Sequence, residues 1–213
     1  MLASGGLDSS VLLADLARES VVYPIYVRKG LAWEDAERAA LDAFVDALGN
    51  PNVRPVTTLS VPARDLYDDH WSLSGVGVPG AGTLDSAVYL PGRNVLLIGL
   101  AAVWCGVRGV SRIAIGSLGG NPFPDATPEF FEAFQLALSR GLDHEITIVA
   151  PYRGLRKEDL VREHRDLPLE LTLTCMAPQG GVHCGRCNKC DERQAAFAAA
   201  GTLDRTGYTR ERE

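Results

Sequence analysis

Near the start of the chain, six consecutive residues have the types and order of a phosphate-binding loop: Ser4-Gly5-Gly6-Leu7-Asp8-Ser9. Two adjacent glycines let the backbone turn tightly and present consecutive N–H groups. Leucines at helical spacing follow at once, so a helix N-terminus, which attracts anions, should stand at the end of the loop. The carboxylate of Asp8 is suited to bind Mg²⁺ that bridges phosphate oxygens. A plain glycine turn with a serine or aspartate helix cap is the alternative interpretation.

Near the other end, four cysteines have the spacing of a structural zinc site. The pattern C-x8-C-x2-C-x2-C is formed by Cys175, Cys184, Cys187 and Cys190. Four thiolates complete a tetrahedral shell around Zn²⁺. Disulfides are the competing interpretation, and His183 could replace one sulfur. The chain shows no pattern of a secretory signal, which favours reduced thiols and therefore zinc. Cys105 lies in an apolar stretch and is expected to be an ordinary core residue.

Length and composition indicate one globular domain, or one domain with a small appendage. The chain has 213 residues, of which 46% are hydrophobic and 23% are charged, as in ordinary globular proteins. Its formal net charge of −6 argues against broad nucleic-acid binding, which usually needs a basic surface. The apolar run around residues 95–103 is too short to cross a bilayer. A cytoplasmic location without a membrane partner is therefore expected.

Apolar runs alternate with helical patterns along the chain. Beyond the loop, strands are predicted over 21–27, 53–61, 112–116 and 146–150, and helices over 34–48, 93–107, 128–140 and 157–163. The helix over 34–48 should turn its acidic residues outward. Its inward-facing residues should be Ala39, Leu41, Ala43, Phe44 and Leu48. The alternation favours an α/β fold with an open, mostly parallel sheet and helices on both faces, plus a small C-terminal zinc-binding element. Ligands bind beyond the carboxyl ends of such strands, where the loop of residues 4–9 lies.

The loop is neither a Walker A loop nor a dinucleotide fingerprint, because Gly-Lys-Ser/Thr and Gly-x-Gly-x-x-Gly are both missing. At Ser4-Gly5-Gly6-x-Asp8-Ser9 it resembles the PP-loop ATP pyrophosphatases, which include GMP synthetase, asparagine synthetase and tRNA-modifying enzymes. The resemblance implies cleavage of ATP between its α- and β-phosphates, with AMP passed to an acceptor. It also implies an ATP-binding set made of Ser4, Gly5, Gly6, Leu7, Asp8, Ser9 and Gly116.

Three further segments resemble the 7-cyano-7-deazaguanine synthases, the QueC family. Leu90-Pro91-Gly92-Arg93-Asn94 is similar to the family's Val-Pro-Gly-Arg-Asn. Phe123-Pro124-Asp125, followed by Pro128-Glu129-Phe130, is similar to Tyr-Pro-Asp-Cys-Arg-x-Glu-Phe. Leu173-Thr174-Cys175 and the three later cysteines match the family's zinc tail. The resemblance implies that ATP adenylates 7-carboxy-7-deazaguanine, that ammonia displaces AMP, and that a second ATP drives dehydration to the nitrile preQ0 in queuosine biosynthesis.

The same resemblance assigns roles to individual residues. Asp8, Lys157 and Arg93 are the expected catalytic residues, and Arg93 with Phe123 and Asp125 should contact the acceptor. Lys157 could instead be a solvated lysine at a helix start, and Asp125 a plain turn residue. Arg93 stands at a helix start, where the dipole disfavours a cation, which favours a role in binding an anion.

The chain departs from the family pattern where the acceptor should bind. Tyr26-Val27-Arg28-Lys29-Gly30 stands in place of Tyr-Gly-Gln-Arg-His, Phe123 in place of Tyr, and Ala126-Thr127 in place of Cys-Arg. Three alternatives stay open. The first is a QueC-like adenylating enzyme that uses another carboxylate acceptor or stops before the nitrile, the second is a PP-loop tRNA-modifying enzyme, and the third is a non-catalytic nucleotide-binding partner inside a larger complex. The second alternative needs a reactive cysteine near the loop, whereas the patterned cysteines are expected to hold zinc.

The expected organisation is an ATP-binding α/β domain over residues 1–165 and a zinc-binding segment over 166–213. The expected cofactors are ATP, Mg²⁺ and Zn²⁺. The expected partners are a small carboxylate and ammonia, with nucleic acid disfavoured and a homodimer left open.

Overall fold

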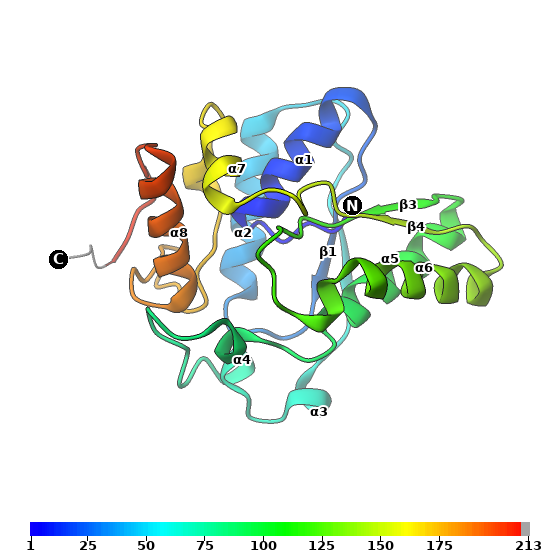
Figure 1. Cartoon of the computed structure of the whole chain (residues 1–213), viewed down its shortest axis with the longest axis horizontal. Helices are drawn as coiled ribbons and strands as arrows, with labels where there is room; N and C mark the ends of the chain where they lie inside the picture. The colour runs from blue at the N-terminus through cyan, green and yellow to red at the C-terminus, as the bar shows by residue number, and fades with distance from the viewer. Residues whose placement is uncertain (210–213) are drawn as a thin grey trace.

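The computed structural model describes residues 1–209 (Figure 1). Its strands are β1 (Ile25–Arg28), β2 (Thr57–Ser60), β3 (Arg112–Ala114) and β4 (Thr147–Val149). Its α-helices are α1 (Leu7–Glu19), α2 (Glu34–Leu48), α3 (Arg64–Tyr67), α4 (Trp71–Ser74), α5 (Arg93–Arg108), α6 (Pro128–Leu142), α7 (Lys157–Glu163) and α8 (Asn188–Ala200). Short 3-10 helices are η1 (Asp85–Val88), η2 (Pro124–Ala126) and η3 (Leu169–Leu171).

The strands are parallel and form two pairs, β1 with β2 and β3 with β4. The first residues of the chain lie between the two pairs. Leu2 forms a parallel bridge with Ile25, and its backbone N–H donates to the Ala114 carbonyl at 2.9 Å. The order across the sheet is therefore β2, β1, residues 1–3, β3 and β4. This arrangement confirms the parallel α/β sheet expected from the sequence, although its central strand is very short.

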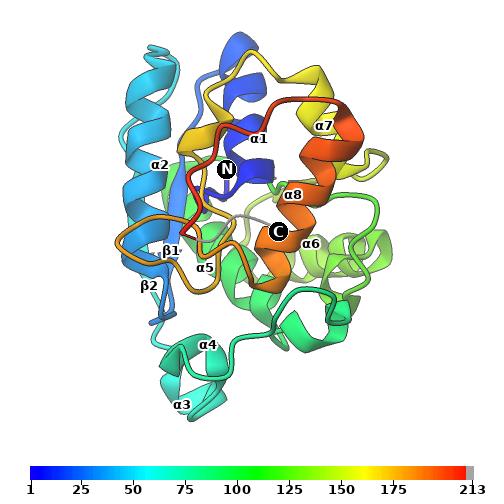
Figure 2. The same ribbon diagram turned by 90° about the vertical axis from the view of Figure 1, so that its left-hand side faces the viewer.

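Helices cover both faces of the sheet, as predicted. Successive residues of an extended strand point to opposite faces. Leu2 and Ile25 accordingly pack with α5 and α6, whereas Ala3 and Tyr26 pack with α1, α2, α7 and α8. Figure 1 shows α5 and α6 side by side, away from α1, α7 and α8. Figure 2 shows the short helices α3 and α4 projecting below the other elements.

Local signals in the sequence explain where several helices begin and end. Helix α2 ends at Gly49, which has φ +54° and closes the helix in the left-handed conformation that favours glycine. Helix α6 begins with Pro128, and the Thr127 side chain accepts a hydrogen bond from the Phe130 backbone N–H. The predicted helix over 157–163 is confirmed to the residue as α7.

The predicted orientation of α2 is wrong for several residues. Leu41 and Phe44 are buried, but Ala39 and Ala43 are exposed. Glu34 and Glu37, expected outward, are 5% and 7% exposed. Their burial is tolerated because both carboxylates accept hydrogen bonds, Glu37 from Tyr26 of β1 and Glu34 from the turn that follows β1.

Within residues 1–209, no helix is long and apolar enough to span a membrane. The proposed division of the chain at residues 165 and 166 stays a prediction. The two parts are in contact, because the Leu173 N–H donates to the Gly5 carbonyl at 2.8 Å.

Candidate active site

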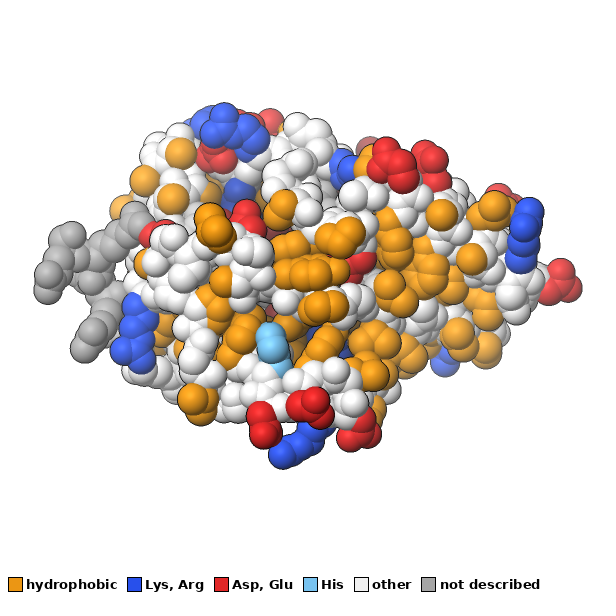
Figure 3. Space-filling model, turned by 60° about the horizontal axis from the view of Figure 1, so that its bottom comes forward, with side chains coloured by type: hydrophobic (Ala, Val, Ile, Leu, Met, Phe, Trp, Pro, Cys, Tyr) orange, Lys and Arg blue, Asp and Glu red, His pale blue; other side chains and the backbone are white. Residues whose placement is uncertain are grey.

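A cleft of about 580 Å³ lies at the carboxyl ends of the strands. It is lined by residues from the N-terminal loop, from the ends of β1 and β3, from the start of α5, and from α7 and α8. Figure 3 shows the face that carries α3 and α4, where hydrophobic side chains cover much of the surface. Parallel α/β sheets bind their ligands at this edge.

The loop of residues 4–9 is held by hydrogen bonds between its own residues. The Ser4 and Ser9 hydroxyl oxygens are 3.0 Å apart. Ser4 Oγ accepts from the Gly6 N–H at 3.2 Å, and Ser9 Oγ donates to the Gly6 carbonyl at 3.1 Å. These bonds fix the loop at the N-terminus of α1, where partial positive charge attracts an anion. Leu7 begins α1; it lines the cleft and is 1% exposed.

Two glycines allow close approach of the backbone around this loop. Gly5 has φ +76°, and a Cβ there would lie 2.4 Å from the Glu37 carbonyl oxygen of α2. Gly116, just after β3, faces the backbone of Asp8 and Ser9, and a Cβ would lie 3.1–3.2 Å from it. Gly116 lines the cleft, whereas Gly5 is not among the lining residues. The structure therefore places Gly5 against α2, where only hydrogen fits.

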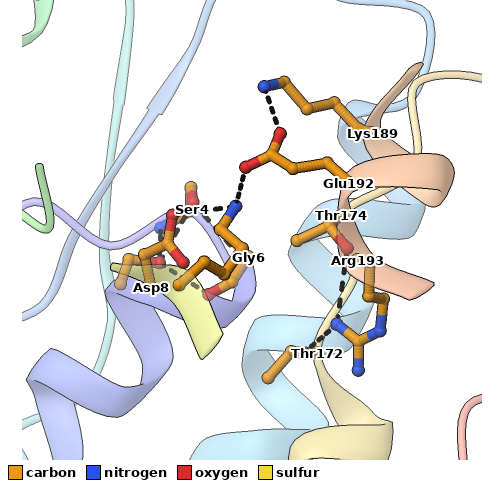
Figure 4. Close-up of polar contacts among 10 residues, drawn as sticks. Ser4, Gly6, Asp8, Thr172, Thr174, Lys189, Glu192 and Arg193 are labelled. Atoms are coloured by element: carbon orange, nitrogen blue, oxygen red, sulfur yellow. Dashed lines mark hydrogen bonds and ion pairs between the residues drawn. The ribbon is translucent and has the colours of Figure 1, made fainter. Parts of the chain in front are cut away.

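A chain of partly buried charges joins the loop to α7 and α8. Lys157 Nζ lies 3.4 Å from Asp8 Oδ2 and forms a close ion pair with Glu192. Glu192 in turn pairs with Lys189 at 2.5 Å. Figure 4 shows Glu192 reaching from α8 toward the loop, with Lys189 beyond it. Lys157 is thus not a solvated helix-start lysine, because its side chain is 14% exposed and has two carboxylate partners.

The pKa values in this chain follow from burial and from the paired charges. Burial raises the pKa of Asp8 above its usual range, although Lys157 opposes the rise. Burial alone would lower the pKa of Lys157, but Asp8 and Glu192 raise it to about 12. Burial would also raise the pKa of Glu192, yet Lys157 and Lys189 lower it to about 2. Lys157 therefore stays protonated at neutral pH, as a residue that contacts phosphate should.

Asp8 also has an oxygen that suits a bound cation. Its Oδ1 is buried and has no hydrogen-bond partner. Buried carboxylate oxygens are normally hydrogen-bonded or bound to a metal ion. Oxygen is the ligand that Mg²⁺ prefers, so the donor set at Asp8 fits this ion.

The expected acceptor residues lie on the opposite wall of the cleft. Arg93 begins α5, and its Nε is buried without a hydrogen-bond partner. Asp125 is 7% exposed, and its Oδ2 accepts from the Asn94 backbone N–H at 2.9 Å. Asp125 also accepts, through its carbonyl, a bond from the Asn94 side chain at 2.9 Å. Its carboxylate therefore caps the N-terminus of α5 at Asn94, the residue after Arg93.

Aromatic side chains form further parts of this wall. Phe123 stacks on Tyr89 with ring centroids 4.9 Å apart, and Trp33 stacks on Trp71 at 5.9 Å. All four side chains line the cleft. Flat aromatic faces suit a planar ring as ligand.

The sequence analysis missed a group of buried polar residues at the end of β1. Lys29, Glu34 and Glu37 are each less than 10% exposed, and Lys29 and Glu37 line the cleft. Burial of the two acidic residues could have been suspected from spacing. Glu34 and Glu37 share one helix stripe with Leu41 and Phe44, the apolar positions that face the core.

The four patterned cysteines come together, and all are buried. Their sulfur atoms lie within 4.8 Å of one another, with Cys184 and Cys190 3.9 Å apart and Cys175 and Cys187 4.0 Å apart. A tetrahedral zinc site with Zn–S bonds of about 2.3 Å separates its sulfurs by about 3.8 Å. A disulfide needs about 2.05 Å, and all five cysteines are free. The geometry thus fits Zn²⁺.

Hydrogen bonds around the sulfurs also suit bound metal. Cys175 Sγ accepts from the N–H groups of Ala177 and Cys184, both at 3.3 Å. Such bonds stabilise a thiolate ligand. His183 does not replace a sulfur, because its Nε2 accepts from the Thr174 N–H at 3.1 Å. Burial lowers the pKa of His183 to about 4, so it is neutral.

The segment around the cysteines contacts the loop of residues 4–9. Besides the Leu173–Gly5 hydrogen bond, Arg193 of α8 anchors this segment. Its guanidinium is 1% exposed and donates to Thr172 at 2.8 Å and to Thr174 at 3.3 Å (Figure 4). Cys187 is the N-cap of α8, the helix that carries Glu192. Direct contacts therefore connect the cysteine site, the ion pairs of Lys157 and Glu192, and the loop of residues 4–9.

Comparisons with known proteins identify the family of this chain. A family model described as "Queuosine biosynthesis protein QueC" matches residues 1–201. A 7-cyano-7-deazaguanine synthase of Methanothrix thermoacetophila is 34% identical over 97% of this chain and 96% of its own length. A 7-cyano-7-deazaguanine synthase of Koribacter versatilis is 32% identical over 98% of this chain and 92% of its own length.

Among solved structures, a predicted subunit of a tRNA methyltransferase from Methanocaldococcus jannaschii covers 75% of this chain with 14% identity and a TM-score of 0.48.

Sheet and cleft define a parallel α/β protein with its cleft at the carboxyl ends of its strands, the edge where such sheets bind ligands. Within that class, the chain belongs to the QueC family.

Proposed function

We propose that this enzyme is an ATP-dependent carbon–nitrogen ligase that converts 7-carboxy-7-deazaguanine to 7-cyano-7-deazaguanine. The observation that carries the proposal is a single cleft lined by the loop, Lys157, Arg93 and aromatic walls. The similar 7-cyano-7-deazaguanine synthases support the choice of product. Zinc cysteines held as thiolates suit a reducing compartment, so we place the reaction in the cytoplasm.

In the first step, a carboxylate oxygen of the acid attacks the α-phosphate of ATP, and pyrophosphate leaves. We assign phosphate contacts to the loop and to the ammonium of Lys157. Mg²⁺ at Asp8 would supply positive charge to the phosphate oxygens. Positioning and charge stabilisation do most of the work in phosphate chemistry of this kind.

Ammonia then attacks the acyl carbon and releases AMP, and the product is an amide. Adenylation of the amide oxygen by a second ATP releases pyrophosphate again. Loss of AMP and protons then gives the nitrile. We assign binding of the planar acid to Phe123 and its aromatic neighbours, with Arg93 and Asp125 at the same wall. The four cysteines would hold a structural zinc, because four sulfurs leave no open position for substrate.

One observation favours a variation on this function. Phe123 stacks on Tyr89 but has no hydroxyl with which to bind a polar heterocycle, as the tyrosine of the family pattern has. A site that loses such a hydrogen bond loses selectivity. An adenylating enzyme for another planar carboxylic acid is therefore the second candidate.

Mass spectrometry of products tests the proposal directly. Purified protein is incubated with ATP, Mg²⁺, ammonium and 7-carboxy-7-deazaguanine, and separately with other 7-deazapurine acids. We expect AMP, pyrophosphate and the nitrile, with Asp8→Asn folded and at least 10-fold slower. Formation of ADP and phosphate alone would contradict cleavage at the α-phosphate. AMP without amide or nitrile from 7-carboxy-7-deazaguanine, but with a product from another acid, would select the second candidate.

A further inference from the structure

Lys29 is a buried cation in the cleft to which nothing above gives a role. It directly follows β1, is 4% exposed, and lines the cleft. The hydrogen bond described for its Nζ is to the Val27 carbonyl at 3.1 Å. Within residues 1–209, no carboxylate lies within 4.0 Å of this nitrogen. A buried ammonium group usually has an anionic partner.

The backbone around Lys29 is fixed by a residue of α2. Glu34 accepts a short hydrogen bond from the Lys29 N–H and another from the Gly30 N–H at 3.0 Å. Gly30 has φ +84°, the left-handed conformation that such a turn requires. Both carboxylate oxygens of Glu34 are therefore used to hold the turn. The lysine side chain is held in place before any ligand arrives.

The charged groups near Lys29 leave it available for an anion. Glu34 is occupied by the backbone, and Glu37 accepts a hydrogen bond from the Tyr26 hydroxyl at 3.0 Å. The Arg93 guanidinium repels Lys29. Burial, followed by this repulsion, lowers the pKa of Lys29 to about 8, and the two glutamates only partly oppose the shift. A ligand carboxylate between the two cations would remove the repulsion.

The position of Lys29 suits the reacting end of the acceptor. Leu2 pairs with Ile25, so Ser4 is level with Val27 in the sheet. Lys29 lies two residues further along the neighbouring strand, about 7 Å beyond the start of the loop. Arg93 lines the same cleft and has a buried Nε without a partner. In the proposed function, Lys157 and the loop of residues 4–9 already bind the phosphates of ATP.

We infer that the ammonium of Lys29 and the guanidinium of Arg93 together bind the carboxylate of the acceptor and present it to the α-phosphate. The inference rests on the proposed function, because it names the group of the acceptor that the cleft recognises. Lys29 is a specificity residue under this proposal. It favours acids over neutral compounds of the same shape.

Calorimetry on the zinc-loaded protein, saturated with Mg²⁺ and a non-hydrolysable ATP analogue, tests this assignment. The ligands are 7-carboxy-7-deazaguanine and the neutral nitrile 7-cyano-7-deazaguanine, and the variants are Lys29→Met and Lys29→Arg. We expect Lys29→Met to weaken binding of the acid by about 10- to 100-fold, the effect of losing a hydrogen bond to a charged group. The affinity for the nitrile should change by less than about 3-fold. Lys29→Arg should retain most of the affinity for the acid.

A pH series separates charge from shape. The wild-type protein should lose affinity for the acid as pH rises above about 8, because Lys29 then releases its proton. Near pH 8 binding should take up as much as about half a proton, seen as a dependence of the enthalpy on buffer. The other charged groups that act on Lys29 are Arg93, Glu37 and Glu34. Lys29→Arg should show neither effect, because arginine stays protonated.

Two results would overturn the assignment. One is equal loss of acid and nitrile affinity in Lys29→Met. The other, which stands even if Lys29→Met fails to fold, is the same pH dependence in Lys29→Arg as in the wild type. Failure of the proposed function is distinguishable, because the wild-type protein would then bind neither 7-deazaguanine compound and would form no nitrile.

Discussion

Replacing Gly5 by alanine adds one methyl group where the loop comes closest to α2. The new Cβ would lie 2.4 Å from the Glu37 carbonyl oxygen and 2.9 Å from the Leu41 nitrogen. Both atoms belong to the backbone of a long helix, so neither can move alone. The φ of +76° adds a second cost, because side chains disfavour this conformation.

The two costs can be separated with a matched control. Gly77 has φ +74°, and a Cβ there would meet nothing within 4 Å. Gly77→Ala should therefore lower the free energy of unfolding by about 1–2 kcal/mol, the cost of the backbone conformation alone. Gly5→Ala should lower it by about 2–5 kcal/mol, because overpacking adds about 1–3 kcal/mol. The effect of alanine on the unfolded chain is common to both variants and cancels in the comparison.

Urea denaturation of the zinc-loaded proteins measures both values, and titration with an ATP analogue measures the consequence for binding. A displaced Gly5 carbonyl would also lose its hydrogen bond from Leu173. Analogue affinity should therefore fall in Gly5→Ala and stay unchanged in Gly77→Ala. Stabilities of the two variants that agree within about 0.5 kcal/mol would refute the close-approach argument.

Three further outcomes are expected. Glu192→Gln should lower the free energy of unfolding at pH 7. The pKa of Glu192, lowered to about 2, corresponds to about 3 kcal/mol of stability. Solvent screening at this side chain, which is 36% exposed, reduces the expected loss to about 1–2 kcal/mol. Because the pKa of Glu192 in the folded protein lies below its usual value, this stabilisation is lost as pH falls from about 4.5 toward 2. The urea midpoints of the variant and the wild type should therefore converge over this range. A constant difference between the midpoints would contradict the pairing with Lys157 and Lys189. Asp125→Ala should lower the free energy of unfolding by about 1 kcal/mol, because the Asn94 N–H loses its acceptor. Asp125→Asn keeps an acceptor oxygen and should lower it by less. Equal losses in the two variants would count against capping. Metal analysis should find one zinc per chain. Removal of the zinc with a chelator should weaken binding of the ATP analogue in parallel with a loss of helicity. Full affinity in the zinc-free protein would disprove the coupling between the cysteine site and the loop.

Sequence patterns predicted those parts of the fold that depend on local signals. The loop of residues 4–9, the end of α2 at Gly49 and the start of α6 at Pro128 each need only a few neighbouring residues, and all occur as expected. The regular strands are shorter than predicted, because the pairing beyond their ends is limited to single bridges and hydrogen bonds. Thus β3 covers Arg112–Ala114, although the Ile115 N–H still donates to the Val149 carbonyl at 2.9 Å.

Features that depend on distant partners were missed. Helix α8 was not predicted, since its first turns are polar and it begins at Asn188, directly after Cys187 of the cysteine cluster. The buried positions of Glu34 and Glu37 depend on β1, which lies beside α2 only in the folded chain. Asp125 was weighed as a turn residue or an acceptor contact, but its carboxylate caps a helix that begins 32 residues earlier, at Arg93. The assignment of individual site residues stays a prediction.

The two walls of the cleft differ in how freely they can change. The wall formed by the loop of residues 4–9, α7 and α8 is fixed by close backbone approaches at Gly5 and Gly116 and by ion pairs through Lys157, so a substitution there disturbs several elements at once. Much of the opposite wall comes from connecting segments, where Tyr89 and Phe123 contact each other mainly as flat rings. Mutation can exchange such rings one at a time at little cost to the core. Under the proposed function, a chain built in this way can acquire a new acceptor during evolution while it keeps the same adenylation chemistry.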